Sequence, residues 1–137
     1  MGMSPTDREF LARFVACEFP KQEFHHAEHV RLAWILLSEA PLLDALLEFR
    51  RLLKAYAAHN GVPGLYNETI TCFYMLLIRE RMESIDANLG WEAFRAAQPE
   101  LFSHPKALLE RYYPGGTAFS PAAKQSFLLP ESTAQAA

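Results

Sequence analysis

The sequence predicts an all-α fold, a helical bundle of four main helices followed by two or three short C-terminal helices. Apolar residues recur three and four positions apart through most of the chain, which is the spacing of one helical face. Proline, glycine and N-capping residues divide these stretches into segments of helical length. No segment has the strict alternation of apolar and polar residues that is typical of a half-buried strand. We expect one domain over residues 1–137, ordered over about 4–130, with a small polar tail at 131–137 that is disordered.

The first two helices have clear boundary signals. Ser4-Pro5 predicts an N-cap and a proline at the first helical position. Phe19-Pro20 ends that helix, because the residue before a proline disfavours the helical conformation. The second helix is expected to begin at His25 or His26 and to reach about Glu39.

The third and fourth helices are long and strongly apolar. Pro41 opens the third helix and Asn60-Gly61 ends it, since both residues tolerate the left-handed conformation of a helix C-terminus. The fourth helix is predicted from Tyr66 to Met82, and it is apolar almost all round, so we expect it to lie centrally. The apolar face of the third helix is expected to contain Leu42, Leu43, Leu46, Leu47, Phe49, Leu52, Leu53 and Tyr56.

Short helices are predicted in the C-terminal third. Trp91–Phe94 has a helical pattern that stops before Pro99. Another helix begins at Pro105 and continues to about Tyr113, where Pro-Gly-Gly breaks it. Ser120-Pro121 predicts the cap of a last short helix.

Charge and composition exclude several classes of protein. The formal net charge is −3 and the isoelectric point is about 5.9, so we expect no nucleic-acid partner, which would require a basic surface. No apolar run approaches the roughly 20 residues of a membrane-spanning helix, so no membrane partner is expected. Cys17 and Cys72 are too few for a disulfide framework and are interpreted as buried free thiols of a cytoplasmic protein. The sequence leaves open whether the protein binds a small-molecule ligand and whether it forms a homo-oligomer.

Three of the five histidines lie within five residues, where the second helix begins. On a helix, His26 and His29 share a face with Ala33, whereas Glu28 lies on the opposite face. His26 and His29 are therefore candidate ligands for a divalent metal, with zinc or iron the ions that suit imidazole. His25 diverges from His26 by about 100°, so it is a candidate for the pocket but not for the same ion.

A second polar cluster, Tyr66-Asn67-Glu68-Thr69-Ile70-Thr71, begins the fourth helix. Glu68 shares a face with apolar residues, so it needs a cation, a donor or a metal as a partner. Arg79 or Arg31 could pair with it, and a carboxylate is also stabilised in the first turn of a helix. Tyr66, Asn67 and Thr71 are further pocket candidates.

The two clusters suggest one site if the two helix starts lie at the same end of the bundle. Two imidazoles and a carboxylate, His26, His29 and Glu68, form the ligand set of several hydrolytic zinc sites and non-haem iron sites. Glu68 would then be the third ligand or a general base, and the open position would take water or a small polar substrate. The leading prediction is a small protein with a His/Glu metal or active site, and a metal-dependent enzyme is one activity that this site would support.

Several alternatives stay open. Residues 25–29 match the inverted zinc-protease pattern H-x-x-E-H, and residues 23–26 match one Glu-x-x-His of a di-iron bundle, but neither motif has its remaining parts. A metal-free pocket would use His29 and Glu68 for acid–base work. In a non-catalytic binding or protein-interaction module, the histidines and Glu68 would form a structural hydrogen-bond network.

Two blocks resemble the signatures of a family of small uncharacterised bacterial proteins. The first is Phe-x-His-x-x-His-x-x-x-Ala-Trp at residues 24–34, and the second is the Tyr-Asn-Glu-Thr block at residues 66–69. The resemblance covers roughly residues 8–130 by the order of these blocks, and it implies a site rather than a reaction. It singles out His26, His29, Tyr66, Glu68 and Thr71. This chain departs from the pattern at Asn67, where the family is expected to have histidine.

Overall fold

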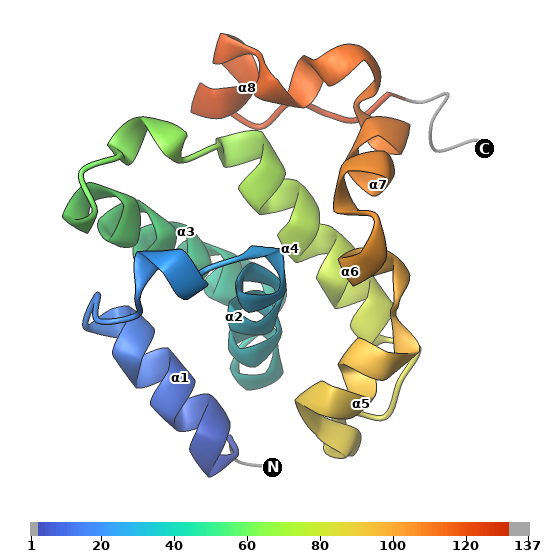
Figure 1. The fold of residues 1–137 in the computed structure, drawn as a ribbon. Coiled ribbons are helices and arrows are strands. Elements are labelled where there is room, and N and C mark those ends of the chain that lie inside the picture. Colours follow the sequence, from blue (N-terminus) through green and yellow to red (C-terminus); the bar gives the residue numbers. More distant parts are fainter. Residues whose placement is uncertain (1–2, 132–137) are drawn as a thin grey trace.

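The computed structural model describes residues 3–131, and this part of the chain is helical without any strand (Figure 1). The all-α prediction is therefore confirmed. The predicted disordered tail falls outside the described residues from 132 onward, whereas Glu131 is described and its N–H donates to the Tyr112 carbonyl at 2.9 Å. The long helices are α1 (Pro5–Val15), α2 (His26–Glu39), α3 (Leu42–His59) and α4 (Glu68–Met82). The shorter ones are α5 (Gly90–Ala97), α6 (Glu100–Ser103), α7 (Pro105–Tyr112) and α8 (Pro121–Gln125), with 3-10 turns η1 (Lys21–Glu23), η2 (Pro63–Leu65), η3 (Ala87–Leu89) and η4 (Pro114–Phe119).

Two predicted N-caps fix the starts of α1 and α8. The Ser4 hydroxyl accepts from the Asp7 N–H at 3.1 Å, and the Ser120 hydroxyl accepts from the Ala123 N–H at the same distance. Helix α4 begins at Glu68, two residues later than predicted, because Asn67 is extended and serves as its N-cap. Capping therefore decides the start where apolar spacing alone does not.

The C-terminal third contains one more α-helix than predicted. The additional helix, α6, is a single turn, and it follows Pro99, which the sequence pattern marks only as a break. A single turn is too short to show helical periodicity, so its sequence carries no signal of that kind.

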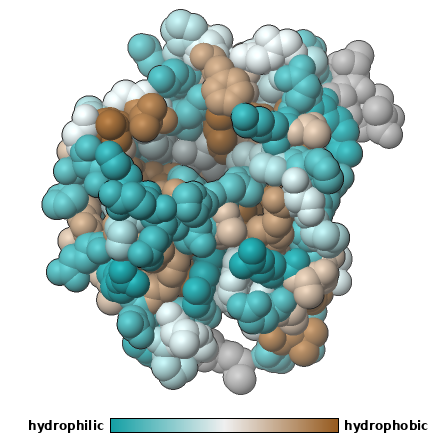
Figure 2. Space-filling model, in the orientation of Figure 1, coloured by the Kyte–Doolittle hydropathy of each residue, from teal (hydrophilic) through white to brown (hydrophobic). Residues whose placement is uncertain are grey.

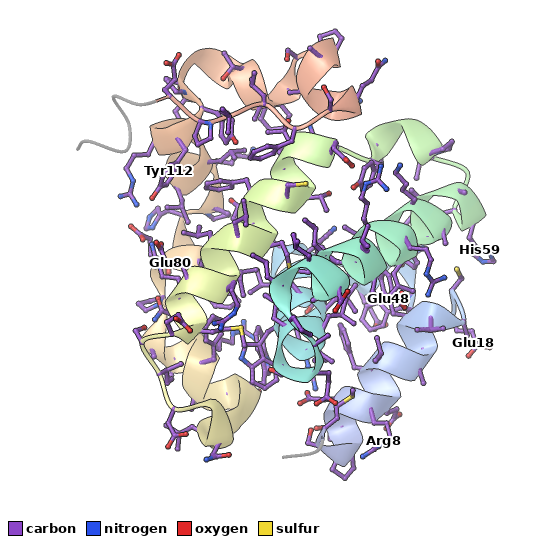
Figure 3. All side chains as sticks on the ribbon, turned by 180° about the vertical axis from the view of Figure 1, so that it is seen from behind. Arg8, Glu18, Glu48, His59, Glu80 and Tyr112 are labelled. Carbon is purple, nitrogen blue, oxygen red and sulfur yellow. The ribbon has the colours of Figure 1, made fainter. Side chains whose placement is uncertain are left out.

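Helix α2 is the most deeply buried element, and it packs against α1, α3 and α4. Val30 and all six residues from Leu32 to Leu37 are buried. Helix α4 also lies centrally, between α1–α3 on one side and α5–α8 on the other, as Figures 1 and 3 show from opposite directions. Arg8, Glu18, Glu48 and His59 are labelled in Figure 3 at the outer surface of α1–α3.

Aromatic side chains fill the core beside the start of α2. The Phe14 ring stacks on Tyr56 with centroids 4.5 Å apart, and Phe24 packs against both rings. The Tyr56 hydroxyl donates to the Phe19 carbonyl at 2.7 Å, which connects α3 to the loop before η1. Buried tyrosines of this kind combine apolar packing with a satisfied hydroxyl.

An ion pair joins the first two helices. Arg31 donates to the buried carboxylate of Asp7 at 2.9 Å, and its guanidinium lies 4.7 Å from the Phe10 ring centroid. Arg31 is thus half-buried, although the helical spacing of the sequence predicts that Arg31 lies on the polar face of α2.

The apolar face of α3 is narrower than predicted. Leu43 is 70% exposed and Leu47 is 63% exposed, so the buried residues of α3 are limited to Ala45, Phe49, Leu52 and Tyr56. Cys17 and Cys72 are free but only half-buried, and Cys17 follows α1 in the left-handed region with φ 58° rather than within the helix.

The C-terminal segment folds back over the start of α4. The buried Thr69 hydroxyl donates to the Ser126 carbonyl and accepts from the Leu128 N–H, both at 3.0 Å. These contacts bring η4 and α8 to the same end of the molecule as the starts of α2 and α4. None of the helices in the described range 3–131 has the length and hydropathy needed to cross a membrane.

Candidate functional site

The two histidines predicted as ligands lie at the start of α2 and hydrogen-bond to backbone carbonyls. His26 Nε2 lies 2.8 Å from the Leu101 carbonyl oxygen, and His29 Nδ1 lies 3.1 Å from the carbonyl oxygen of His25. A carbonyl oxygen only accepts, so these ring nitrogens carry the protons and donate. Each imidazole therefore keeps its other nitrogen as a hydrogen-bond acceptor.

Burial keeps both imidazoles neutral. It lowers the pKa of His29 from 6.5 to about 4, and the hydrogen bond to the His25 carbonyl only partly opposes this effect. Burial also lowers the pKa of His26, against the opposing hydrogen bond to Leu101. The His29 ring packs on Phe24 with centroids 3.9 Å apart, and the His26 ring meets Tyr74 edge-on at 5.2 Å. Both rings are thus held by aromatic neighbours as well as by hydrogen bonds.

His25 is separated from these two rings by its position. It is the N-cap of α2 and is exposed, and its backbone N–H donates to the Glu28 carboxylate at 2.9 Å. Glu28 thus stabilises the helix start rather than serving as a protease-type general base.

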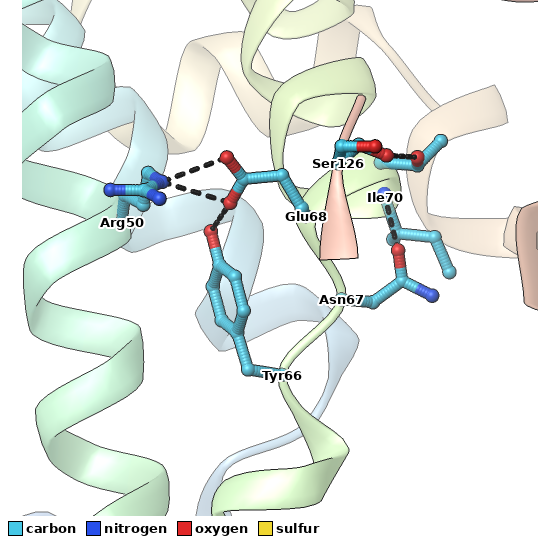
Figure 4. Close-up of polar contacts among 7 residues, drawn as sticks. Arg50, Tyr66, Asn67, Glu68, Ile70 and Ser126 are labelled. Atoms are coloured by element: carbon cyan, nitrogen blue, oxygen red, sulfur yellow. Dashed lines mark hydrogen bonds and ion pairs between the residues drawn. The ribbon is translucent and has the colours of Figure 1, made fainter. Parts of the chain in front are cut away.

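Glu68 faces α3 rather than the histidines (Figure 4). Arg50 Nε donates to both of its carboxylate oxygens at 2.8 and 2.9 Å, and the Tyr66 hydroxyl donates to one of them at 2.8 Å. Arg79 and Arg31, the partners considered from the sequence, pair instead with Glu83 and Asp7.

The contacts of Glu68 set its protonation state. Burial tends to raise its pKa, but the bonds from Arg50 and Tyr66 outweigh that effect, and the net pKa is lowered. Burial raises the pKa of Tyr66 well above its ordinary value, and the bond to Glu68 adds to the shift. Glu68 is therefore an ionised, fully engaged carboxylate, which makes it a weak base.

Asn67 and Thr71 come from the start of α4. Asn67 accepts from the Ile70 N–H at 2.9 Å (Figure 4) and donates through its other amide atom to the Ala118 carbonyl at 2.8 Å. The residue that departs from the family pattern thus makes two hydrogen bonds that fix the start of α4. Thr71 is buried one turn further along α4.

These helix starts enclose a cavity of about 690 Å³. In Figure 2 this face is hollowed between η2 and the C-terminal segment, and hydrophobic side chains gather beside the hollow. Its lining is mostly apolar and aromatic, and it includes five of the residues predicted from the sequence. The predicted ones are His26, His29, Tyr66, Asn67 and Thr71. The apolar and aromatic ones include Phe24, Val30, Phe49, Leu53, Tyr56, Ile70, Tyr74 and Ile78.

The three predicted metal ligands do not form one set in the structure. His26 and His29 line the cavity, whereas Glu68 lies against Arg50 and does not line it. Within residues 3–131, no group of three histidine, cysteine, aspartate or glutamate side chains is arranged to hold an ion. Zinc or iron binding therefore stays a prediction from the sequence.

Sequence reasoning missed two contributors to the site. Arg50 gave no signal, because its role depends on the packing of α3 against α4. Tyr74 did give a sequence signal, because it belongs to a set of residues with the spacing of one helical face. The set is Asn67, Thr71, Tyr74 and Ile78. Extending the polar cluster along that face would have found it.

Comparison with known proteins adds no relative. No family model, no curated protein and no solved structure matches the chain. The resemblance to a small bacterial family stays a prediction, and function has to be argued from the cavity.

Proposed function

We propose that this protein binds a small molecule with a largely apolar body in the cavity at the starts of α2 and α4. One observation carries the proposal: side chains from both predicted polar clusters line a single cavity of about 690 Å³ that is otherwise mostly apolar. Ligand pockets have typical volumes of about 300–1,000 Å³, apolar walls and a few convergent polar groups. The same features support a ligand site here.

The polar groups in the wall suit recognition of a ligand. His26 and His29 both line the cavity, and the ring nitrogen that each does not use toward a backbone carbonyl is an acceptor. The residue predicted as the general base, Glu68, is occupied by Arg50 and Tyr66. These contacts favour binding over acid–base catalysis as the role of the site.

A fluorescence titration tests the proposal with N-phenyl-1-naphthylamine, a neutral apolar probe that brightens when it leaves water. We expect saturable binding near one probe per chain. Ala57→Trp should weaken it strongly, because Ala57 lines the cavity and the indole would take up part of the space. Ala58→Trp is the matched control: Ala58 is the next residue of α3 and is exposed, so this variant should bind normally.

The outcomes separate the possibilities. Binding that is weakened or lost only in Ala57→Trp supports the cavity. Absent or non-saturable binding, or equal binding in both tryptophan variants, would refute the proposal. Elemental analysis of untagged protein and of His29→Ala runs in parallel. Near-stoichiometric zinc or iron that disappears in the variant would favour the predicted metal site instead.

A further inference from the structure

The ionised side chains around the cavity are all of one sign. Lys21 and Lys124 line the cavity, and Lys54 and Lys124 line a hollow of about 650 Å³ beside it. Tyr66, Phe119 and Lys124 belong to both linings, so the hollow adjoins the cavity. No aspartate or glutamate of the described chain lines either space. The chain has 16 acidic and 13 basic residues, so composition alone would favour the opposite sign.

These lysines have no carboxylate partner within 4 Å in the described range, whereas six arginines do. Lys54 lies with its Nζ 5.1 Å from the centre of the Tyr66 ring, which holds the ammonium at the mouth of the cavity. Glu68 is close enough to Lys54 for the lysine charge to lower its pKa, but Arg50 already neutralises that carboxylate. The positive charge at the mouth is therefore available to a ligand.

The interior of the cavity does not suit an anion. The N–H of His29 is committed to the His25 carbonyl, and the free nitrogen is an acceptor that would repel a carboxylate oxygen. A buried charge without a partner is strongly disfavoured. At the mouth, by contrast, the apolar lining continues outward through Leu65 and Phe119, which are 73% and 63% exposed. A ligand with an apolar body inside the cavity and an anionic group at the mouth would match this division.

We infer that the ligand is an amphiphile with a single anionic head group, held at the mouth by Lys54 and Lys124, and with its hydrocarbon part in the cavity. This inference rests on the proposed function and adds the chemical class of the ligand. Charge complementarity at the mouth supplies the preference for an anion, and apolar burial supplies most of the affinity.

A matched pair of probes tests the inference. Dodecanoate and 1-dodecanol have the same chain length but differ in head-group charge, and each is titrated below its aggregation limit as a competitor of N-phenyl-1-naphthylamine at pH 8. We expect dodecanoate to bind more tightly. The double variant Lys54→Gln/Lys124→Gln should weaken dodecanoate about fivefold to tenfold, as for the loss of two exposed ion pairs, and leave dodecanol within about twofold. Lys106→Gln, an exposed residue of α7 outside both linings, is the control.

Each outcome has one meaning. A dodecanoate preference that falls in the double variant and at high salt supports the inference. Equal affinity for both competitors in the wild-type protein, or a preference that survives in the double variant, would overturn it while leaving the proposed cavity intact. If the neutral probe itself fails to bind, the proposed function fails and this inference fails with it.

Discussion

The structure predicts that His29 makes the protein sensitive to mild acid. Burial of its ring against Phe24 holds His29 neutral, and the hydrogen bond from the ring N–H to the His25 carbonyl only partly opposes this effect. Its pKa is lowered in the folded protein, so the unfolded chain takes up the proton first as the pH falls. Stability from this group is complete above pH 6.5 and is lost as the pH falls toward 4.

The size of the effect follows from the two pKa values. A fall from 6.5 to about 4 corresponds to about 3 kcal/mol of folding free energy, of which about 2 kcal/mol is lost by pH 5. That is a large part of the roughly 5–15 kcal/mol by which a domain of this size is stable. The lowered pKa values of His26 and Glu68 give acid sensitivity of the same sign, so a variant is needed to isolate His29.

His29→Asn is that variant, because asparagine does not titrate and its amide can still donate to the His25 carbonyl. The measurement is the free energy of unfolding in urea at pH 7.0, 6.0, 5.0 and 4.5, followed by circular dichroism. We expect the variant to be less stable at pH 7, where it loses the packing on Phe24, but to lose about 2 kcal/mol less than wild type between pH 7 and pH 5. Parallel pH curves for the two proteins, or a histidine NMR titration that places His29 near 6.5, would refute the reasoning.

Three other perturbations follow from single contacts. Asn67→Ala should lower the free energy of unfolding by about 1 kcal/mol, because the Ile70 N–H loses its cap, whereas Asn67→Ser should retain most of it; equal losses in urea unfolding would contradict the cap. Thr69→Val keeps the shape but removes the hydroxyl that bonds the Ser126 carbonyl, so backbone amides of residues 126–131 should exchange hydrogen faster while those of α2 do not. Unchanged exchange would show that other contacts hold the segment. Leu32→Ala should cost about 2–5 kcal/mol in a fully buried position. The same change at exposed Leu43 should stay within about 0.5 kcal/mol, and similar costs at both sites would be inconsistent with this core.

Local signals predicted the helix boundaries well. Ser4 and Ser120 cap the helices that their positions suggest, and Gly61, at φ 75°, follows the end of α3. The failures have physical reasons. Tyr66 precedes α4 because Asn67 takes the N-cap position. Leu43 is exposed because the packed side of α3, against α1, α2 and α4, is formed by Ala45, Phe49, Leu52 and Tyr56.

The candidate site was partly predictable. Two clusters of polar residues at the starts of apolar helices were recognisable because a polar group on an apolar face needs a partner. The structure brings five of those residues to one cavity, but Glu68 is paired with Arg50 of α3. Periodicity places a residue on a face of its own helix and cannot place the partner on another helix.

The sequence by itself determined what depends on near neighbours: helical class, most helix starts, and the position of two imidazoles on the apolar side of α2. These features follow from contacts three and four residues apart, which chain geometry fixes. Only the tertiary structure decided which ring nitrogens donate, which cation neutralises Glu68, and that lysines from three elements line the cavity or the hollow beside it. His26 finds its acceptor in Leu101, 75 residues away, and Asn67 finds Ala118, 51 residues away. Contacts at such separations depend on how the helices pack, and packing is a property of the whole chain.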